Sequence, residues 1–277
     1  MQTYKIALAG LFLLALAACT PTVEKTNLAA PLTASQLKFS VTQEQGYDNI
    51  VYLQSETPGI IPYWNWGTGF SSKLLDTVDL AFAGTHVLYY GVSSAGNFIE
   101  ADSVNVKVTQ NDPVYFADPR WNMLTNGAAG KKWVLDMTQP IGWYGLDYLK
   151  NNGSAADWSW HPTYAGNEWT MDSVYWGSMT FNLDGNFNYS VSQNDNTGAN
   201  PQNCGCTFSA NLATNSIALN GCGLLFGGGS NYSTEVSNWS AVTIIALSDS
   251  SMTLGVVRDE TGAANICWIG FTFKPAP

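Results

Sequence analysis

The chain has 277 residues, with 21 acidic and 11 basic side chains, a net charge of −10 and a sequence pI near 4.4. An acidic chain without a basic patch repels a phosphate backbone, so nucleic acid is excluded as the expected partner. Charged residues make up only 12% of the chain and aromatic residues 13%, which is typical of an extracellular β protein with long loops.

The first eighteen residues have the pattern of a signal peptide. Lys5 precedes an apolar run over residues 6–16, which is too short to span a membrane because crossing takes about 20 residues. The run ends in Leu-Ala-Ala before Cys19, and this ending resembles a lipobox. The resemblance implies export through the general secretory pathway, cleavage after residue 18 and acylation of Cys19, which would anchor the protein on the outer membrane with its domains surface-exposed. The alternative is an ordinary secretory signal followed by an incidental cysteine.

Residues 19–36 are expected to form a tether, because they contain prolines and small polar residues and no aromatic ring. The first folded unit is expected over residues 37–110. Strand patterns occur at 37–41, 49–53, 85–92 and 102–108. Several short strands at this spacing predict a β-sandwich.

Two motifs in this unit are informative. Residues 64–69 read Trp-Asn-Trp-Gly-Thr-Gly and residues 83–88 read Ala-Gly-Thr-His-Val-Leu. They resemble the W-D-F-G-D-G turn and the A-G-T-Y-T-V strand entry of polycystic-kidney-disease (PKD) domains, although Asn65 and Thr68 stand where that family usually has Asp. The resemblance implies an Ig-like sandwich that serves as a spacer or a protein-contact module in extracellular carbohydrate-handling proteins. His86 is interpreted as structural.

The second domain is expected over residues 118–275. A short helix is predicted at 118–127, with Asp118 as N-cap, Pro119 at the first helical position and Gly127 past the end. Strands are predicted at 131–137, 172–183, 186–191, 206–212, 216–219, 241–247, 252–258 and 266–273, with a tight turn at Asp184-Gly185. Sequential hairpins of this kind form an antiparallel meander that must hide its edges. An all-β fold is therefore predicted, with a sandwich or jelly roll favoured here and a lipocalin-like barrel as the alternative.

Four cysteines follow Cys19, and an even number outside the cytoplasm predicts disulfides. Cys206 and Cys222 lie symmetrically about a hairpin turn near Thr214, so they are candidates to pair, and Cys204 competes. Cys267 is the fourth candidate. A zinc site at Cys204-Gly-Cys206 is disfavoured because both histidines are distant in sequence, and no metal or cofactor is expected.

Aromatic crowding is the main functional signal. Seven of the eleven tryptophans fall between residues 121 and 176. Trp121, Trp133 and Trp176 lie in predicted regular elements and are expected in the core. Most of 140–172 lacks strand periodicity, so its rings are expected on a long loop, where they either stack on sugars or form a small core of their own. The candidate glycan-binding residues are Trp143, Tyr144, Asp147, Asp157, Trp158, Trp160, Glu168 and Trp169.

A second resemblance covers the start of this domain. Residues 124–127 (Leu-Thr-Asn-Gly), 131–136 (Lys-Lys-Trp-Val-Leu-Asp), 142–145 (Gly-Trp-Tyr-Gly) and 157–160 (Asp-Trp-Ser-Trp) are similar to the pattern L-T-G-G, K-T-W-V-x-D, G-H-x-G-V-G and P-D-W-W. That pattern occurs in PKD-bearing surface lipoproteins of bacterial polysaccharide-utilisation systems, although Trp143 replaces the family's histidine. The resemblance implies a glycan-capture lipoprotein that works with other surface proteins of an uptake complex.

Two other function classes remain open from the sequence. A glycosidase would need two carboxylates about 5 to 9.5 Å apart, for which Asp147, Asp157, Glu168 and Asp172 are the candidates. No catalytic motif accompanies them, so the chain is interpreted as non-catalytic. An adhesin or assembly protein would instead use the aromatic surface to bind another protein.

Overall fold

The computed structural model describes residues 30–228, 232, 234–259 and 266–277. The predicted signal peptide, Cys19 and most of the predicted tether lie outside these residues. Within the described part the chain forms two compact units, of which the second comprises Lys107–Pro277 together with Gln43–Val51 and Asp79–His86. At the start, Thr33 and Gln36 form a capping box around the 3₁₀ turn η1 (Ala34–Gln36).

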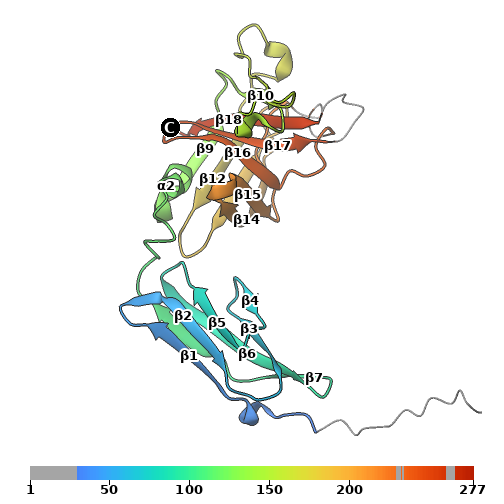
Figure 1. Cartoon of the computed structure of the whole chain (residues 1–277). Coiled ribbons are helices and arrows are strands. Elements are labelled where there is room, and N and C mark those ends of the chain that lie inside the picture. Colours follow the sequence, from blue (N-terminus) through green and yellow to red (C-terminus); the bar gives the residue numbers. More distant parts are fainter. Residues whose placement is uncertain (1–29, 229–231, 233, 260–265) are drawn as a thin grey trace, which may run out of the picture. The chain divides into compact units, whose positions relative to one another are not determined.

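The N-terminal region contains two β-sheets (Figure 1). One sheet has the order β1-β2-β5, and the other has the order β4-β3-β6-β7 with β8 paired to β6. The strands are β1 (Phe39–Glu44), β2 (Tyr47–Ser55), β3 (Ile61–Asn65), β4 (Phe70–Ser71), β5 (Leu75–Asp79), β6 (Gly84–Ser94), β7 (Asn97–Glu100) and β8 (Val104–Val108). The predicted strands correspond to β1, β2, β6 and β8.

Aromatic rings fill the core of these sheets. The Tyr90 ring lies 4.5 Å from the Phe39 ring and 4.4 Å from the Trp64 ring, centroid to centroid. Trp64 and Tyr90 are both buried, and the Tyr90 hydroxyl lies 2.6 Å from Oγ of Ser55. The ring of Trp64 thus belongs to the core, and the turn after it closes with a hydrogen bond from the Trp66 N–H to the Gly69 carbonyl.

A short helix, α2 (Arg120–Thr125), precedes the second domain's strands as predicted. Its N-cap is Pro119 and not Asp118 as predicted, although the Asp118 carboxylate accepts a 2.9 Å hydrogen bond from the Arg120 N–H. Asn126 ends it with a left-handed φ of 52°. The 3₁₀ turn η2 (Gly127–Ala129) then leads into the first strand.

Eight strands of the second domain, all within the described residues, form a closed antiparallel barrel. They are β9 (Lys131–Leu135), β12 (Gly177–Asn182), β13 (Asn188–Gln193), β14 (Gln202–Asn211), β15 (Ser216–Asn220), β16 (Ala241–Leu247), β17 (Met252–Arg258) and β18 (Cys267–Pro275). Each pairs with its neighbour in this series, and β18 also pairs with β9, which closes the sheet. The favoured sandwich or jelly roll was therefore wrong, and the barrel alternative was right. Closure removes every edge in the meander, which a sandwich leaves exposed.

The barrel interior is packed with large apolar side chains. Trp133, Phe181, Phe208 and Phe273 are almost completely buried, as are most inward-facing residues of β16, β17 and β18. Trp121, Trp133 and Trp176 are all buried, which confirms their predicted place in the core. The domain therefore draws its stability from a filled interior.

A wide bulge separates β9 from β10 (Ile141–Tyr144). Both strands pair with β18, since Leu135 lies opposite Phe273 and Ile141 lies opposite Phe271. Residues 136–140 loop out between these two pairs, opposite the single residue Thr272. Beyond this bulge the chain no longer follows β12, so the outer edge of β10 is open to a new partner.

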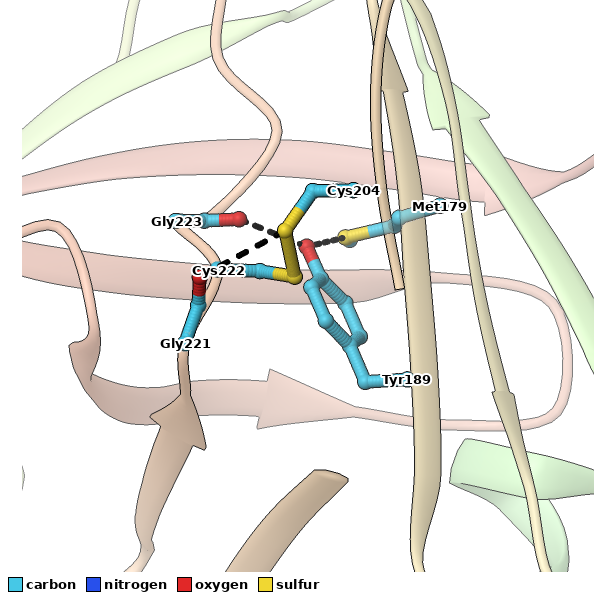
Figure 2. The surroundings of a disulfide bond; sticks show 6 residues. All are labelled: Met179, Tyr189, Cys204, Gly221, Cys222 and Gly223. Atoms are coloured by element: carbon cyan, nitrogen blue, oxygen red, sulfur yellow. Dashed lines mark hydrogen bonds between the residues drawn. A yellow bond between two sulfur atoms is a disulfide. The ribbon is translucent and has the colours of Figure 1, made fainter. Parts of the chain in front are cut away.

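One disulfide ties the barrel wall to the segment that follows β15. Cys204 of β14 bonds to Cys222, with the Cα atoms 5.9 Å apart (Figure 2). Beside it, the buried Tyr189 hydroxyl donates to the Gly223 carbonyl at 3.0 Å. Cys206 and Cys267 are free thiols, so the favoured Cys206–Cys222 pair was wrong and the competing Cys204 forms the bond. The hairpin argument missed that Gly221 turns the chain off β15, which brings Cys222 to Cys204.

Candidate functional site: a row of indoles on a hairpin

The segment predicted as a long loop contains a short hairpin. β10 pairs antiparallel with β11 (Ser159–Trp160), with Trp143 opposite Trp160 and Tyr144 opposite Ser159. Because side chains alternate along a strand, Trp143 and Trp160 share one face of the hairpin and Tyr144 lies on the other. The alternation in Trp158-Ser159-Trp160 was the available sequence signal for this strand.

On the first face, three tryptophans form a continuous row, which we call the indole row: Trp143, Trp160 and Trp169. The rings of Trp143 and Trp160 stack with centroids 4.9 Å apart and planes 27° apart. Trp169, from the 3₁₀ turn η4 (Glu168–Thr170), lies 6.1 Å from Trp160 with planes 18° apart. The structure thus brings together three of the predicted ligand-binding rings.

Exposure increases along the indole row. Trp143 is half-buried and meets the ring of Tyr232 edge-on at 6.2 Å. Trp160 is 45% exposed and Trp169 is 66% exposed. Trp158, two residues before Trp160 and just outside β11, is 38% exposed. The inner ring is therefore fixed by packing, while the outer rings face solvent.

The second face anchors the hairpin to the barrel. Tyr144 is buried, and its ring lies 5.0 Å from that of Tyr148 and 6.0 Å from that of His161. Burial is the main cause that raises the pKa of Tyr144 to about 12. Tyr144, a predicted ligand-binding residue, is thus packed over Gly270 of β18 and exposes little of its ring.

Two glycines permit these close approaches, and the sequence analysis missed both. A Cβ on Gly270 of β18 would lie 2.6 Å from the Tyr144 ring. A Cβ on Gly145 would lie 2.0 Å from the Ala156 carbonyl oxygen and 2.8 Å from Nε1 of Trp158. Glycine at both positions lets the hairpin lie against β18 and close on itself.

The predicted carboxylates support local turns. Asp147 accepts from Nζ of Lys150 at 2.6 Å and from Oγ of Ser154 at 2.8 Å, inside the loop that contains η3 (Tyr148–Lys150). Asp157 accepts from the Gly153 N–H at 2.7 Å.

Glu168 has a similar role at the start of η4, where it accepts from the Gly166 N–H at 3.0 Å. These partners hold two pKa values below their usual range. Lys150 and Ser154 lower the pKa of Asp147, and backbone N–H groups lower that of Glu168. Both side chains are therefore anionic at neutral pH.

Among the described residues, no group of three or more His, Cys, Asp or Glu side chains is arranged to hold a metal ion. In the same part of the chain, no helix combines the length and the apolar character that a membrane span requires. Comparison of the sequence with protein-family models and with curated proteins found no match.

Proposed function

We propose that this protein is a non-catalytic cell-surface lipoprotein that captures a polysaccharide or oligosaccharide on the indole row. The observation that carries the proposal is the stack of Trp143, Trp160 and Trp169, which ends in two strongly exposed rings. The apolar C–H face of a pyranose stacks on an indole, and such contacts are worth on the order of 1 kcal/mol each. An open row of rings suits an extended glycan chain.

The support beneath the row favours binding. Trp143 is held by its cross-strand pair with Trp160 and by Tyr232, and the hairpin is held by Tyr144 against β18. Rings on a rigid element lose little conformational freedom when a ligand binds, so more of the stacking energy appears as affinity.

The remaining parts suit a surface location. The lipobox-like ending at Cys19 would anchor the chain in the outer membrane, and the N-terminal sandwich would act as a PKD-like, Ig-like spacer. The residues of the two PKD-like motifs form a turn after Trp64 and the start of strand β6 at Gly84, which is compatible with such a spacer.

Two of the four candidate carboxylates, Asp147 and Glu168, support the non-catalytic part of the proposal. A glycosidase needs a general acid whose pKa is raised. Asp147 and Glu168 have lowered pKa values, and both accept hydrogen bonds from groups of their own loops.

Glycan capture is tested by affinity electrophoresis of the mature chain through a panel of polysaccharides. Trp169→Ala should weaken binding about fivefold or more, since one stacking contact is lost, and Trp160→Ala should weaken it further because it also removes the cross-strand stack. Tyr175→Ala is the matched control, because Tyr175 is 55% exposed in the same domain and, among the described residues, has no ring contact with the row. Equal retardation of all three variants would refute the proposed site, and release of reducing sugar by the unmodified chain would show an enzyme.

The anchor is tested separately by cell fractionation. Cys19→Ser should move the protein from the membrane fraction to a soluble fraction, because the acylated residue is removed. Retention of the variant in the membrane fraction would contradict lipid anchoring and leave glycan capture untouched.

A further inference from the structure

The sheet β4-β3-β6-β7 of the N-terminal sandwich carries a second set of exposed rings. Register places Tyr63 opposite Gly91, Asn65 opposite both Phe70 and Tyr89, and Ser93 opposite both Ile61 and Phe98. The inward residues of these strands include the buried Trp64 and Tyr90, so the alternate residues face outward. We call this outward surface the aromatic face: Ile61, Tyr63, Phe70, Tyr89 and Phe98.

Its side chains contact one another and remain open to solvent. The Tyr63 ring lies 6.2 Å from Phe70 and 5.7 Å from Phe98, and Phe98 covers Gly91. Phe70 is 72%, Ile61 69% and Phe98 56% exposed. Contiguous exposed apolar side chains of this size mark an interaction surface.

The chemistry of the aromatic face differs from that of the indole row. Its polar groups are Ser93, the Glu100 carboxylate on the edge strand β7, the two tyrosine hydroxyls and Asn65, whose Oδ1 already accepts a hydrogen bond from the Gly67 N–H. Its three most exposed members, Phe70, Ile61 and Phe98, offer no hydrogen-bonding group. A surface built this way suits an apolar partner better than a sugar, whose hydroxyls need partners.

The described chain begins beside this face. The Leu32 N–H donates to Oγ of Ser94 at 3.3 Å, and Ser94 pairs with Asn97 next to the pair of Ser93 with Phe98. Cys19 is eleven residues before Ala30 (30 − 19), and a stretch of that length spans at most about 36–40 Å. The segment between them contributes only Val23 and Leu28 as large aliphatic side chains, too few to cover the face itself.

We propose that the aromatic face docks on the surface of the lipid bilayer that holds Cys19. The proposal rests on the lipid anchor of the proposed function, because the short tether keeps the face close to the bilayer and at high effective concentration there. Tyr and Phe are favoured at a membrane interface, and a net charge of −10 disfavours strongly anionic lipids. The same charge disfavours a second copy of the chain as the occupant.

The test uses the acylated full-length mature chain in phosphatidylcholine vesicles. The photoreactive residue p-benzoylphenylalanine replaces Phe98 in one variant and Phe70 in a second, and Thr77, exposed on β5 of the other sheet, in a control. After illumination, mass spectrometry should find lipid adducts at positions 98 and 70 and several-fold fewer at position 77. Substitution at these exposed positions leaves the core intact, and thermal melts check it.

Crosslinks to a second protein chain, or no lipid adduct at both positions in acylated protein, would overturn the proposal. The same spectra report acylation of Cys19, so an unacylated chain would show that the anchor itself fails and would remove the docking proposal with it. Polysaccharide retardation of these variants should match that of the unmodified chain, which separates this face from glycan capture.

Discussion

Tryptophan has opposite roles in two neighbouring regions of the second domain. Trp133 on β9 points into the barrel, is fully buried and donates its Nε1–H to the Leu124 carbonyl at 3.0 Å. Trp160 on β11 lies beyond the bulge that follows β9 and is 45% exposed. The residue type is the same, so the difference lies in which partner strand the backbone meets. Whether a tryptophan is buried in this domain therefore depends on which strand its own strand pairs with.

The largest test of this contrast compares stability at the two positions. Trp133→Ala should lower the free energy of unfolding by about 3–5 kcal/mol, because a large cavity opens in the barrel. Trp169→Ala should change it by no more than about 0.5 kcal/mol, because the ring is mainly in solvent. Urea denaturation followed by circular dichroism measures both, and similar losses would mean that the indole row is a small core of its own.

The disulfide provides a test of intermediate size. Cys204→Ser with Cys222→Ser should cost about 3 kcal/mol, as expected for a closed loop of this length, and should leave glycan binding unchanged in the folded protein. Both cysteines are replaced so that Cys206 cannot pair with Cys222. Cys206→Ser is the control, since it keeps the disulfide and should have a small effect.

Thiol counting checks the same assignment. The denatured, unreduced and acylated mature chain should show two reactive thiols, Cys206 and Cys267. A count of zero would contradict this assignment, because it would mean that Cys206 and Cys267 are also in disulfide bonds.

A smaller loss of stability than at Trp133 or the disulfide is expected at the hairpin. Gly145→Ala places a methyl group against the Ala156 carbonyl, so the hairpin must shift, at a cost of about 1–3 kcal/mol. Polysaccharide binding to the indole row should also weaken, because a shifted hairpin changes the spacing of the rings. Gly205→Ala is the matched control, since nothing lies within 4 Å of its Cβ position. Unchanged polysaccharide retardation of Gly145→Ala would separate the hairpin geometry from ligand binding.

Several elements were predictable because their signals are local. β16 and β17 match the predicted ranges 241–247 and 252–258, where apolar runs are bounded by the serine-rich turn at 248–251. The helix after Asp118 was predictable from the Asp-Pro and Asn-Gly pairs around it, although its N-cap is Pro119 and not Asp118. In the N-terminal region β3, β5 and β7 were missed, since Pro62 interrupts the strand pattern of β3 and Leu75–Asp79 is largely polar. Their strand conformation depends on sheet neighbours.

The candidate site was predictable in composition but not in geometry. Crowding of tryptophan in 140–172 located the region, and Trp143, Trp160 and Trp169 do come together. The hairpin that orders them is only four residues paired with two, too short for periodicity to detect. The burial of Tyr144 was not predictable, because it depends on Gly270, which follows it by more than a hundred residues.

The sequence by itself determined the β class, most strand positions, the helix before the barrel and the tryptophans of the core, because propensity, alternation and turn residues act over a few neighbours. Tertiary structure alone decided that the meander closes, that Cys204 reaches Cys222, and that Trp160 and Trp169 face solvent. Closure depends on the register between β9 and β18, at opposite ends of the domain. Such a pairing is selected by the packing of the whole interior, which no local pattern encodes.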